Sequence, residues 1–135
     1  MKTGIWLDKE KAHIVTLNDG KMSFNTILSN IENFRIHGGS GTKFKGGPQD
    51  VVQDSRYLER EKHQFRTYFK KLVSEINNAN AIVLFGPAET GEKFYKELTT
   101  HYKDLSAKIK DVTKADSMTK RQIIAWVKDF FKPAS

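Results

Sequence analysis

The chain has 135 residues and no cysteine; 38% of its residues are hydrophobic, 29% are charged, and its formal net charge is +7. This length fits one domain with a hydrophobic core, and the lack of cysteine excludes disulfides and thiolate chemistry. No apolar run is long enough for a membrane span, and acidic residues interrupt the N-terminal stretch MKTGIWLDKEK, so we expect neither membrane insertion nor a signal peptide. We therefore expect a soluble, cytoplasmic protein without membrane contacts.

Three short segments rich in β-branched and aromatic residues open the chain, at 3–8 (TGIWLD), 11–18 (KAHIVTLN) and 21–28 (KMSFNTIL). The turn sequence NDG separates the last two, and Met22, Phe24 and Thr26 alternate in the third segment. The pattern predicts a three-stranded antiparallel meander.

The segment 37–50 (HGGSGTKFKGGPQD) holds five of the nine glycines, namely Gly38, Gly39, Gly41, Gly46 and Gly47. Two lysines, Lys43 and Lys45, lie between them. Glycine is free to adopt many backbone conformations, so this composition predicts a flexible, basic loop. In this interpretation the glycines give the segment reach and the lysines give it affinity for phosphate.

A long amphipathic helix is predicted after the loop, with Asp54 or Ser55 as its N-cap. At 100° per residue one stripe is apolar, formed by Leu58, Phe65, Phe69, Leu72 and Ile76. The opposite side is basic, with Arg56, Arg60, His63, Lys70 and Lys71, and with Arg66 at its margin. We expect the apolar stripe to pack on a sheet and the basic side to face solvent.

The second half of the chain alternates strands and helices. The apolar run 81–85 (AIVLF) predicts a buried strand, and Pro87 and Glu89 suit the start of the next helix, whose apolar positions are Phe94, Tyr95, Leu98 and Tyr102. A more exposed strand is predicted at 106–113. The last helix has Thr119 and Gln122 in capping-box spacing and a buried stripe of Ile123, Ile124, Val127, Phe130 and Phe131.

These elements predict a single α/β domain with a mixed sheet, an antiparallel meander at its start and helices packed on it. The positive charge is concentrated in one region. Residues 35–71 contain nine basic and four acidic residues, a net +5, while residues 1–34 are neutral overall and residues 72–135 carry +2. A local basic patch favours a polyanionic partner, above all nucleic acid, although a solvated surface of a basic protein is the alternative.

The sequence offers little for catalysis or metal binding. The four histidines show no metal-ligand spacing, so no metal and no cofactor are expected. His13 reads as an ordinary strand residue, whereas His37 and His63 lie beside the basic patch. Asp8 ends the first strand and reads as a turn residue. Gln49 is the one weak catalytic candidate.

The order of a basic glycine-rich loop, a long basic helix (YLEREKHQFRTYFKKL) and a buried strand with its following helix (IVLFGPAETGEKFYKEL) resembles a known family. It is similar to the middle domain of the eukaryotic and archaeal class I release factors and of Pelota, and to small bacterial proteins related to that domain. The resemblance covers residues 1–135 and implies a ribonuclease H-like fold and a partner in the translation apparatus.

Release factors carry Gly-Gly-Gln in this loop, which helps water cleave the peptidyl-tRNA ester. This chain has Gly46-Gly47-Pro48-Gln49 instead. Because Pro48 fixes a backbone angle and displaces the glutamine amide by one residue, we do not carry peptide hydrolysis over to Gln49. Pelota, whose corresponding domain is basic but lacks the release motif, is the closer analogy.

The leading hypothesis is therefore a non-catalytic RNA-binding module of the translation apparatus that contacts ribosomal RNA or tRNA, with a role in ribosome rescue or quality control. The residues expected to meet RNA phosphates are Lys43, Lys45, Arg56, Arg60, His63, Arg66 and Lys70. Two alternatives stay open. One is a peptidyl-tRNA hydrolase that uses Gln49 to position water, and the other is a protein-interaction module that docks a partner through its helices. The pattern predicts no oligomeric state.

Overall fold

The computed structural model describes residues 1–31, 47–87 and 89–132, without the side chains of residues 47–57. Its centre is a five-stranded mixed sheet in the order β3-β2-β1-β4-β5. The strands are β1 (Lys2–Leu7), β2 (Lys11–Asn18), β3 (Lys21–Leu28), β4 (Ala81–Gly86) and β5 (Ile109–Lys114), and the helices are α2 (Gly47–Ile76), α3 (Thr90–His101), α4 (Lys103–Ser106) and α5 (Lys120–Phe130).

The N-terminal meander is confirmed, because β1 pairs antiparallel with β2 and β2 pairs antiparallel with β3. The strand β4 then joins β1 in parallel, and β5 joins β4 in parallel. The continuous apolar run of β4 follows from this position, since β4 is an interior strand covered on both faces. The predicted α/β class and mixed sheet are therefore confirmed.

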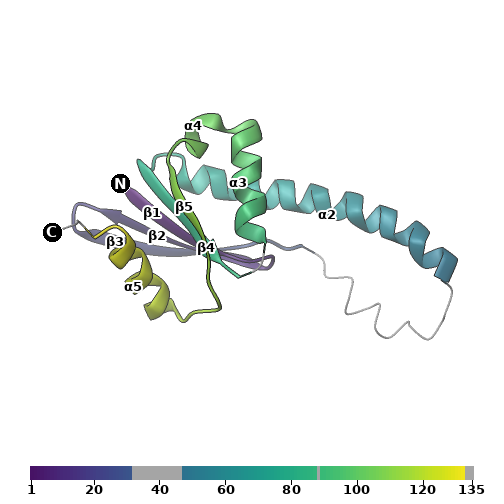
Figure 1. Cartoon of the computed structure of the whole chain (residues 1–135), viewed down its shortest axis with the longest axis horizontal. Helices are drawn as coiled ribbons and strands as arrows, with labels where there is room; N and C mark the ends of the chain where they lie inside the picture. Colours follow the sequence, from purple (N-terminus) through teal and green to yellow (C-terminus); the bar gives the residue numbers. More distant parts are fainter. Residues whose placement is uncertain (32–46, 88, 133–135) are drawn as a thin grey trace.

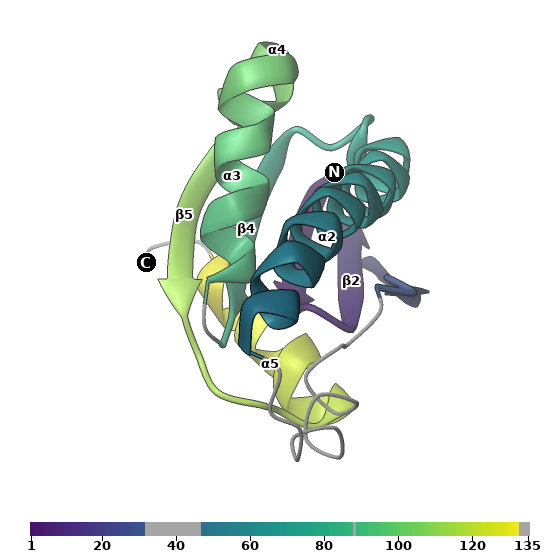
Figure 2. The same cartoon turned by 90° about the vertical axis from the view of Figure 1, so that its right-hand side faces the viewer.

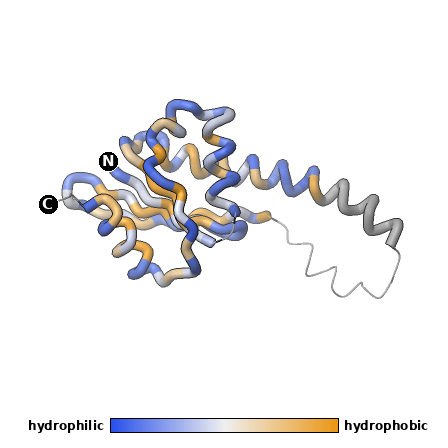
Figure 3. Tube along the Cα trace, viewed as in Figure 1, coloured by the Kyte–Doolittle hydropathy of each residue, from blue (hydrophilic) through white to orange (hydrophobic). Residues whose placement is uncertain are grey.

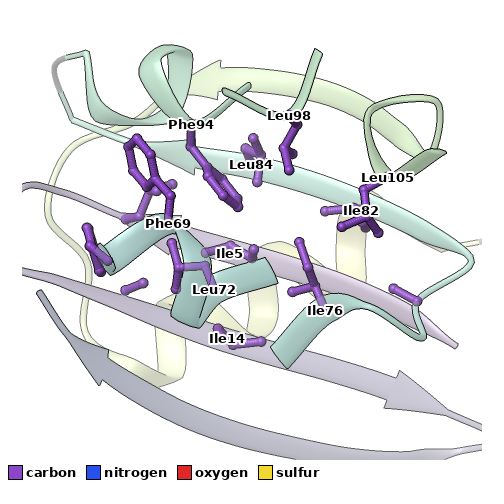
Figure 4. Close-up of a cluster of buried hydrophobic side chains, with 14 of the residues drawn as sticks. Ile5, Ile14, Phe69, Leu72, Ile76, Ile82, Leu84, Phe94, Leu98 and Leu105 are labelled. Carbon is purple, nitrogen blue, oxygen red and sulfur yellow. The ribbon is translucent and has the colours of Figure 1, made fainter. Parts of the chain in front are cut away.

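The larger part of the core lies on the face of the sheet that α2 and α3 cover (Figure 1). Figure 4 shows Phe69, Leu72 and Ile76 of α2 and Phe94 and Leu98 of α3 pointing toward strand residues such as Ile5, Ile14 and Leu84. All of these side chains are at most 4% exposed. Because this layer contains more buried apolar side chains than the other one, it makes the larger hydrophobic contribution to folding, at about 25 cal/mol for each Å² of apolar surface removed from water.

The helix α5 covers the opposite face and forms a smaller core (Figure 2). Its buried residues Ile123 and Val127 pack with Trp6, Val15 and Phe85 of the sheet. The approach is close at Gly4, where an added Cβ atom would lie 2.4 Å from Val127 Cγ2. The predicted stripe on α5 is confirmed at Ile123 and Val127, whereas Ile124, Phe130 and Phe131 are only partly buried.

The predicted capping box of α5 is present. Thr119 Oγ1 accepts a hydrogen bond from the Gln122 backbone N–H at 3.2 Å, and the Thr119 N–H donates to Gln122 Oε1 at 2.9 Å. The start of α3 differs from the prediction. Glu89 is its N-cap and Thr90 its first residue, so Pro87 lies before the helix. The short helix α4 was not predicted, and β5 begins at Ile109 rather than at residue 106.

The helix α2 begins at Gly47, so the prediction of Asp54 or Ser55 as its N-cap is wrong. Gly47, Pro48 and Gln49 form its first turn, and the expectation of a flexible loop is therefore wrong for residues 47–50. The physical reason is that proline is tolerated in the first turn of a helix, where its missing N–H needs no partner. The rest of the loop, residues 37–46, lies outside the described residues.

Candidate nucleic-acid interface

The outward side of α2 carries an exposed row of basic side chains, Arg60, His63, Arg66 and Lys70, which we call the basic stripe. These residues follow one another at spacings of three and four positions, which places them along one side of a helix. Lys71 is exposed beside them. Figure 3 shows blue, hydrophilic segments along this part of α2, alternating with orange, hydrophobic ones.

The stripe is held in place by the opposite side of the same helix. Phe65 is 8% exposed, Phe69 is 4% exposed, and Leu72 and Ile76 are almost fully buried. Tyr68, which the sequence analysis did not place in the core, is fully buried, and its hydroxyl donates a hydrogen bond to the Asp8 carbonyl oxygen at 3.1 Å. Burial raises the pKa of the Tyr68 hydroxyl, and the nearby Asp8 adds to this effect.

One predicted core residue is not buried. Leu58, at the N-terminal end of the apolar stripe, is 58% exposed. The reason is geometric: Figure 1 shows the N-terminal half of α2 extending past the ends of the strands, so that no strand lies beneath it. The prediction that the stripe packs on the sheet thus holds from Phe65 onward and is wrong for Leu58.

The remaining residues expected to bind RNA fall where the structure gives no side-chain positions. Lys43 and Lys45 lie outside the described residues, as do Gly38, Gly39, Gly41 and Gly46. The backbone of Arg56 belongs to α2, four residues before Arg60, but its side chain is not described. The basic stripe therefore comprises the four predicted contact residues whose side chains the structure describes.

A groove of about 380 Å³ lies between α2 and α3, beside the basic stripe. Its floor is apolar, and its rim carries three cations and two carboxylates. The lining residues are Leu58, Glu61, Lys62, Phe65, Arg66, Phe69, Lys93 and Glu97. Arg66 thus belongs both to the stripe and to this groove, which continues the basic surface from α2 toward α3.

The rim of the groove is more positive than its count of three cations and two carboxylates suggests, because of the contacts that Glu61 and Lys93 make. Glu61 is engaged by Lys9 of the β1–β2 turn, with the Lys9 Nζ to Glu61 Oε2 distance at 2.6 Å. Lys93 lies over the ring of Phe65, with its Nζ atom 4.6 Å from the ring centroid. The Lys93 ammonium is consequently held above the groove floor near Lys62 and Arg66, rather than directed away along α3.

Sequence analysis missed Lys62 and Lys93 as candidate contact residues. Periodicity could have placed Lys62 at the border of the basic side of α2, because it precedes Arg66 by four residues. No local signal could have found Lys93, because it reaches the groove only through the packing of α3 against α2. The aromatic contact between Phe69 and Phe94, whose ring centroids are 5.1 Å apart, fixes that packing.

Two other polar residues that the sequence analysis weighed, Asp8 and His13, have structural roles, and His37 lies outside the described residues. Asp8 holds the β1–β2 turn, since its Oδ1 atom accepts hydrogen bonds from the N–H groups of Glu10 and Lys11. His13 lies in β2 between the rings of Trp6 and Phe24 and contacts Thr26 Oγ1 through Nδ1 at 2.9 Å. In the described part of the chain, no three histidine, aspartate or glutamate side chains are grouped as a metal site would require.

Comparison with known proteins identifies the fold only. No protein-family model and no curated protein matches the sequence. Among solved structures, the chain is similar to an archaeal translation termination factor, aRF1, with a TM-score of 0.58 and 11% sequence identity over 98% of this chain. The match covers 35% of that factor, so this chain spans about a third of its length.

The chain therefore has a release-factor-like α/β fold. At this identity the similarity extends to the fold alone, and both the correspondence to the middle domain and the ribonuclease H-like assignment remain predictions. Within the described residues, none of the helices combines the length and the apolar character that crossing a membrane requires.

Proposed function

We propose that this chain is an RNA-binding module of the translation apparatus, and that it contacts ribosomal RNA or tRNA in the cytoplasm without catalysing a reaction. The observation that carries the proposal is the exposed basic stripe on α2, in a fold similar to that of a translation termination factor. Exposed lysine and arginine side chains in a row match the spaced charges of a nucleic-acid backbone and release its counterions on binding.

The groove between α2 and α3 extends this interface. Lys62 and Lys93 add two cations to Arg66 on its rim, while Lys9 offsets the charge of Glu61. The described cations come from two rigid helices, which favours recognition of the spacing of phosphates and of RNA shape over the reading of single bases. Lys43, Lys45 and Arg56 complete the proposed contact set at the N-terminal end of α2.

The proposal gives Gln49 no catalytic role. The sequence argument is that Pro48 separates it from the two glycines, and the backbone adds that both residues belong to the first turn of α2. A helical backbone leaves little freedom to reposition the glutamine amide toward an ester. A peptide-release assay on the wild type and on Gln49→Ala tests this point, and the expected result is that neither protein releases peptide above the background rate.

The main test is co-sedimentation of the purified protein with 70S ribosomes over a range of salt concentrations. The test variant is Arg66→Glu/Lys70→Glu on α2, and the matched control is Arg121→Glu/Lys128→Glu, which makes the same charge change on exposed positions of α5. We expect wild-type binding to weaken steeply with salt and the control to bind nearly as well. In the test variant the slope of log affinity against log salt should fall by roughly two.

Two results would overturn the proposal. The first is absence of wild-type binding at low salt, which would leave the basic stripe as a solvated surface. The second is an equal loss of binding in both variants, which would mean that net charge rather than the α2 surface drives the association. Circular dichroism of each variant must show the wild-type helix content for either comparison to be valid.

A further inference from the structure

The strand β3 is an edge of the sheet, and its outer side carries no partner strand in the described part of the chain. It is eight residues long and pairs with β2 without interruption from Lys21 to Leu28. Lys21, the first residue of β3, is the one charged residue of the strand, and the strand contains neither proline nor glycine. An exposed edge of this kind presents unpaired backbone N–H and C=O groups to any further strand.

The opposite edge of the same sheet is protected in the usual ways. The strand β5 is six residues long, and three of them, Lys110, Asp111 and Lys114, are charged. Its pairing with β4 is also interrupted by a register shift next to Ile82 and Val83. Charges and bulges of this kind discourage edge-to-edge association. The edge strand β5 has these features and β3 lacks them. The β3 edge is therefore suited to pairing with a further strand.

The side chains of β3 show which partner fits. Met22 is 41% exposed and Leu28 is 59% exposed, which makes them two of the few large hydrophobic side chains exposed in the described structure. Both lie on the α5 side of the sheet. Met22, Phe24 and Leu28 are separated by even numbers of positions, so their side chains project from the same face of the strand, and Phe24 packs against the smaller core. They lie three residues before and three residues after Asn25, so the exposed apolar positions are symmetric about that residue.

We propose that β3 pairs antiparallel with β3 of a second copy of this chain, in a register centred on Asn25, and joins two five-stranded sheets into one continuous sheet. In this register Met22 of each copy lies opposite Leu28 of the other, and Phe24 lies opposite Thr26. Each exposed hydrophobic side chain thereby gains an apolar cross-strand neighbour, which is the unit of sheet stabilisation. Lys21 falls beyond the paired stretch, so no charged residues of the two strands themselves lie opposite each other.

The symmetry is consistent with this arrangement. A twofold axis perpendicular to the sheet at Asn25 keeps the α5 side of both copies on the same face, as the pairing of Met22 with Leu28 requires. The same patch is used on both copies, which gives a closed dimer and leaves no edge for further growth at β3. Because one strand pair buries less surface than a standard interface, the dimer is weak and depends on protein concentration.

The register can be tested directly because the chain has no cysteine. We would make Met22→Cys and Leu28→Cys variants with different tags and join them with a short thiol-specific cross-linker. The proposal expects a mixed cross-linked dimer when the two variants are combined and much less cross-linking with either variant alone. In the proposed register two copies of Met22→Cys hold their thiols roughly 20 Å apart, whereas Met22→Cys and Leu28→Cys lie directly opposite.

A Leu58→Cys variant serves as the control for random collision, because Leu58 is as exposed as Leu28 but lies on α2. If mixed cross-linking does not exceed that of Leu58→Cys, the proposal is wrong. Sedimentation velocity of the wild type gives an independent check. The sedimentation coefficient should rise with concentration, and Met22→Lys/Leu28→Lys should abolish the rise while Leu58→Lys preserves it. A wild type that stays monomeric at millimolar concentration would also overturn the proposal.

Discussion

Lys93 of α3 lies over the ring of Phe65 of α2, with the ammonium nitrogen 4.6 Å from the ring centroid. The contact joins the two helices that cover the larger core, and it does so at the rim of the groove between them. One side chain therefore serves two purposes: its charge faces the proposed RNA-binding surface, and its position depends on an aromatic residue of the core.

Replacing Lys93 by methionine keeps most of the aliphatic stem but removes the cation from the Phe65 ring. We expect the free energy of unfolding to fall by about 0.5–1 kcal/mol, the usual strength of an exposed cation–π contact. Urea unfolding followed by tryptophan fluorescence measures this change. Lys96→Met, which alters an exposed lysine of the same helix, should change stability less. Equal losses in both variants would argue against a contribution from the cation–π contact.

Gly4→Ala should be strongly destabilising. The added methyl group would lie 2.4 Å from Val127 Cγ2, closer than two carbon atoms can approach, so α5 or the side chain of Val127 must shift. Overpacking of this kind costs about 1–3 kcal/mol. In the double variant Gly4→Ala/Val127→Ala the clash is removed, and its total loss should be smaller than the sum of the two single losses. Additive losses, measured by urea unfolding, would contradict this account.

The capping box at α5 predicts a loss of helix stability in Thr119→Ala. The variant leaves the Gln122 N–H without its acceptor, and the free energy of unfolding should fall by about 1 kcal/mol. Thr119→Ser retains the hydroxyl acceptor and should stay close to the wild type. Thermal unfolding of the three proteins under identical conditions gives the comparison, and a serine variant as unstable as the alanine variant would show that the hydroxyl is not the cause.

Stability should depend on pH through His13. Burial, and to a lesser degree the Lys11 ammonium, lowers the pKa of His13 below its ordinary value of 6.5, although Asp8 opposes the shift. Between the folded pKa and 6.5 the unfolded chain binds more protons than the folded one, so stability rises with pH across that window and is lost as pH falls through it. His13→Gln should show a smaller drop in the free energy of unfolding between neutral pH and about pH 5.

The limits of sequence reasoning are clearest along α2. The spacing of Phe65, Phe69, Leu72 and Ile76 predicted the buried side, because a 3.6-residue repeat maps directly onto one side of a helix. The same repeat includes Leu58, yet Leu58 is exposed. Periodicity shows which side of a helix is apolar, but it contains no information on where the surface beneath that side ends.

The start of α2 shows a different limit. The sequence placed Gly46, Gly47 and Pro48 in a loop at 37–50 and the N-cap of the next helix at Asp54 or Ser55, but proline breaks a helix only in its interior and suits its first turn. The position of Lys93 over Phe65 was beyond any sequence argument, because 28 residues separate the two and only the packing of α3 on α2 brings them together. By contrast, the bounds of β2 and β3 were predicted correctly, since alternation and the NDG turn are local signals.

The projecting N-terminal half of α2 gives this protein the mechanics of a lever (Figure 1). From Gly47 to Phe65, the first buried side chain described on it, the helix runs for about 27 Å at 1.5 Å per residue. A core substitution that tilts the helix by about 5° would therefore move its far end by about 2 Å, which is enough to break a hydrogen bond. Core residues such as Phe69 and Leu72 thus set the direction of the N-terminal end of α2. Substitutions there can alter the proposed RNA binding although these residues do not contact the RNA.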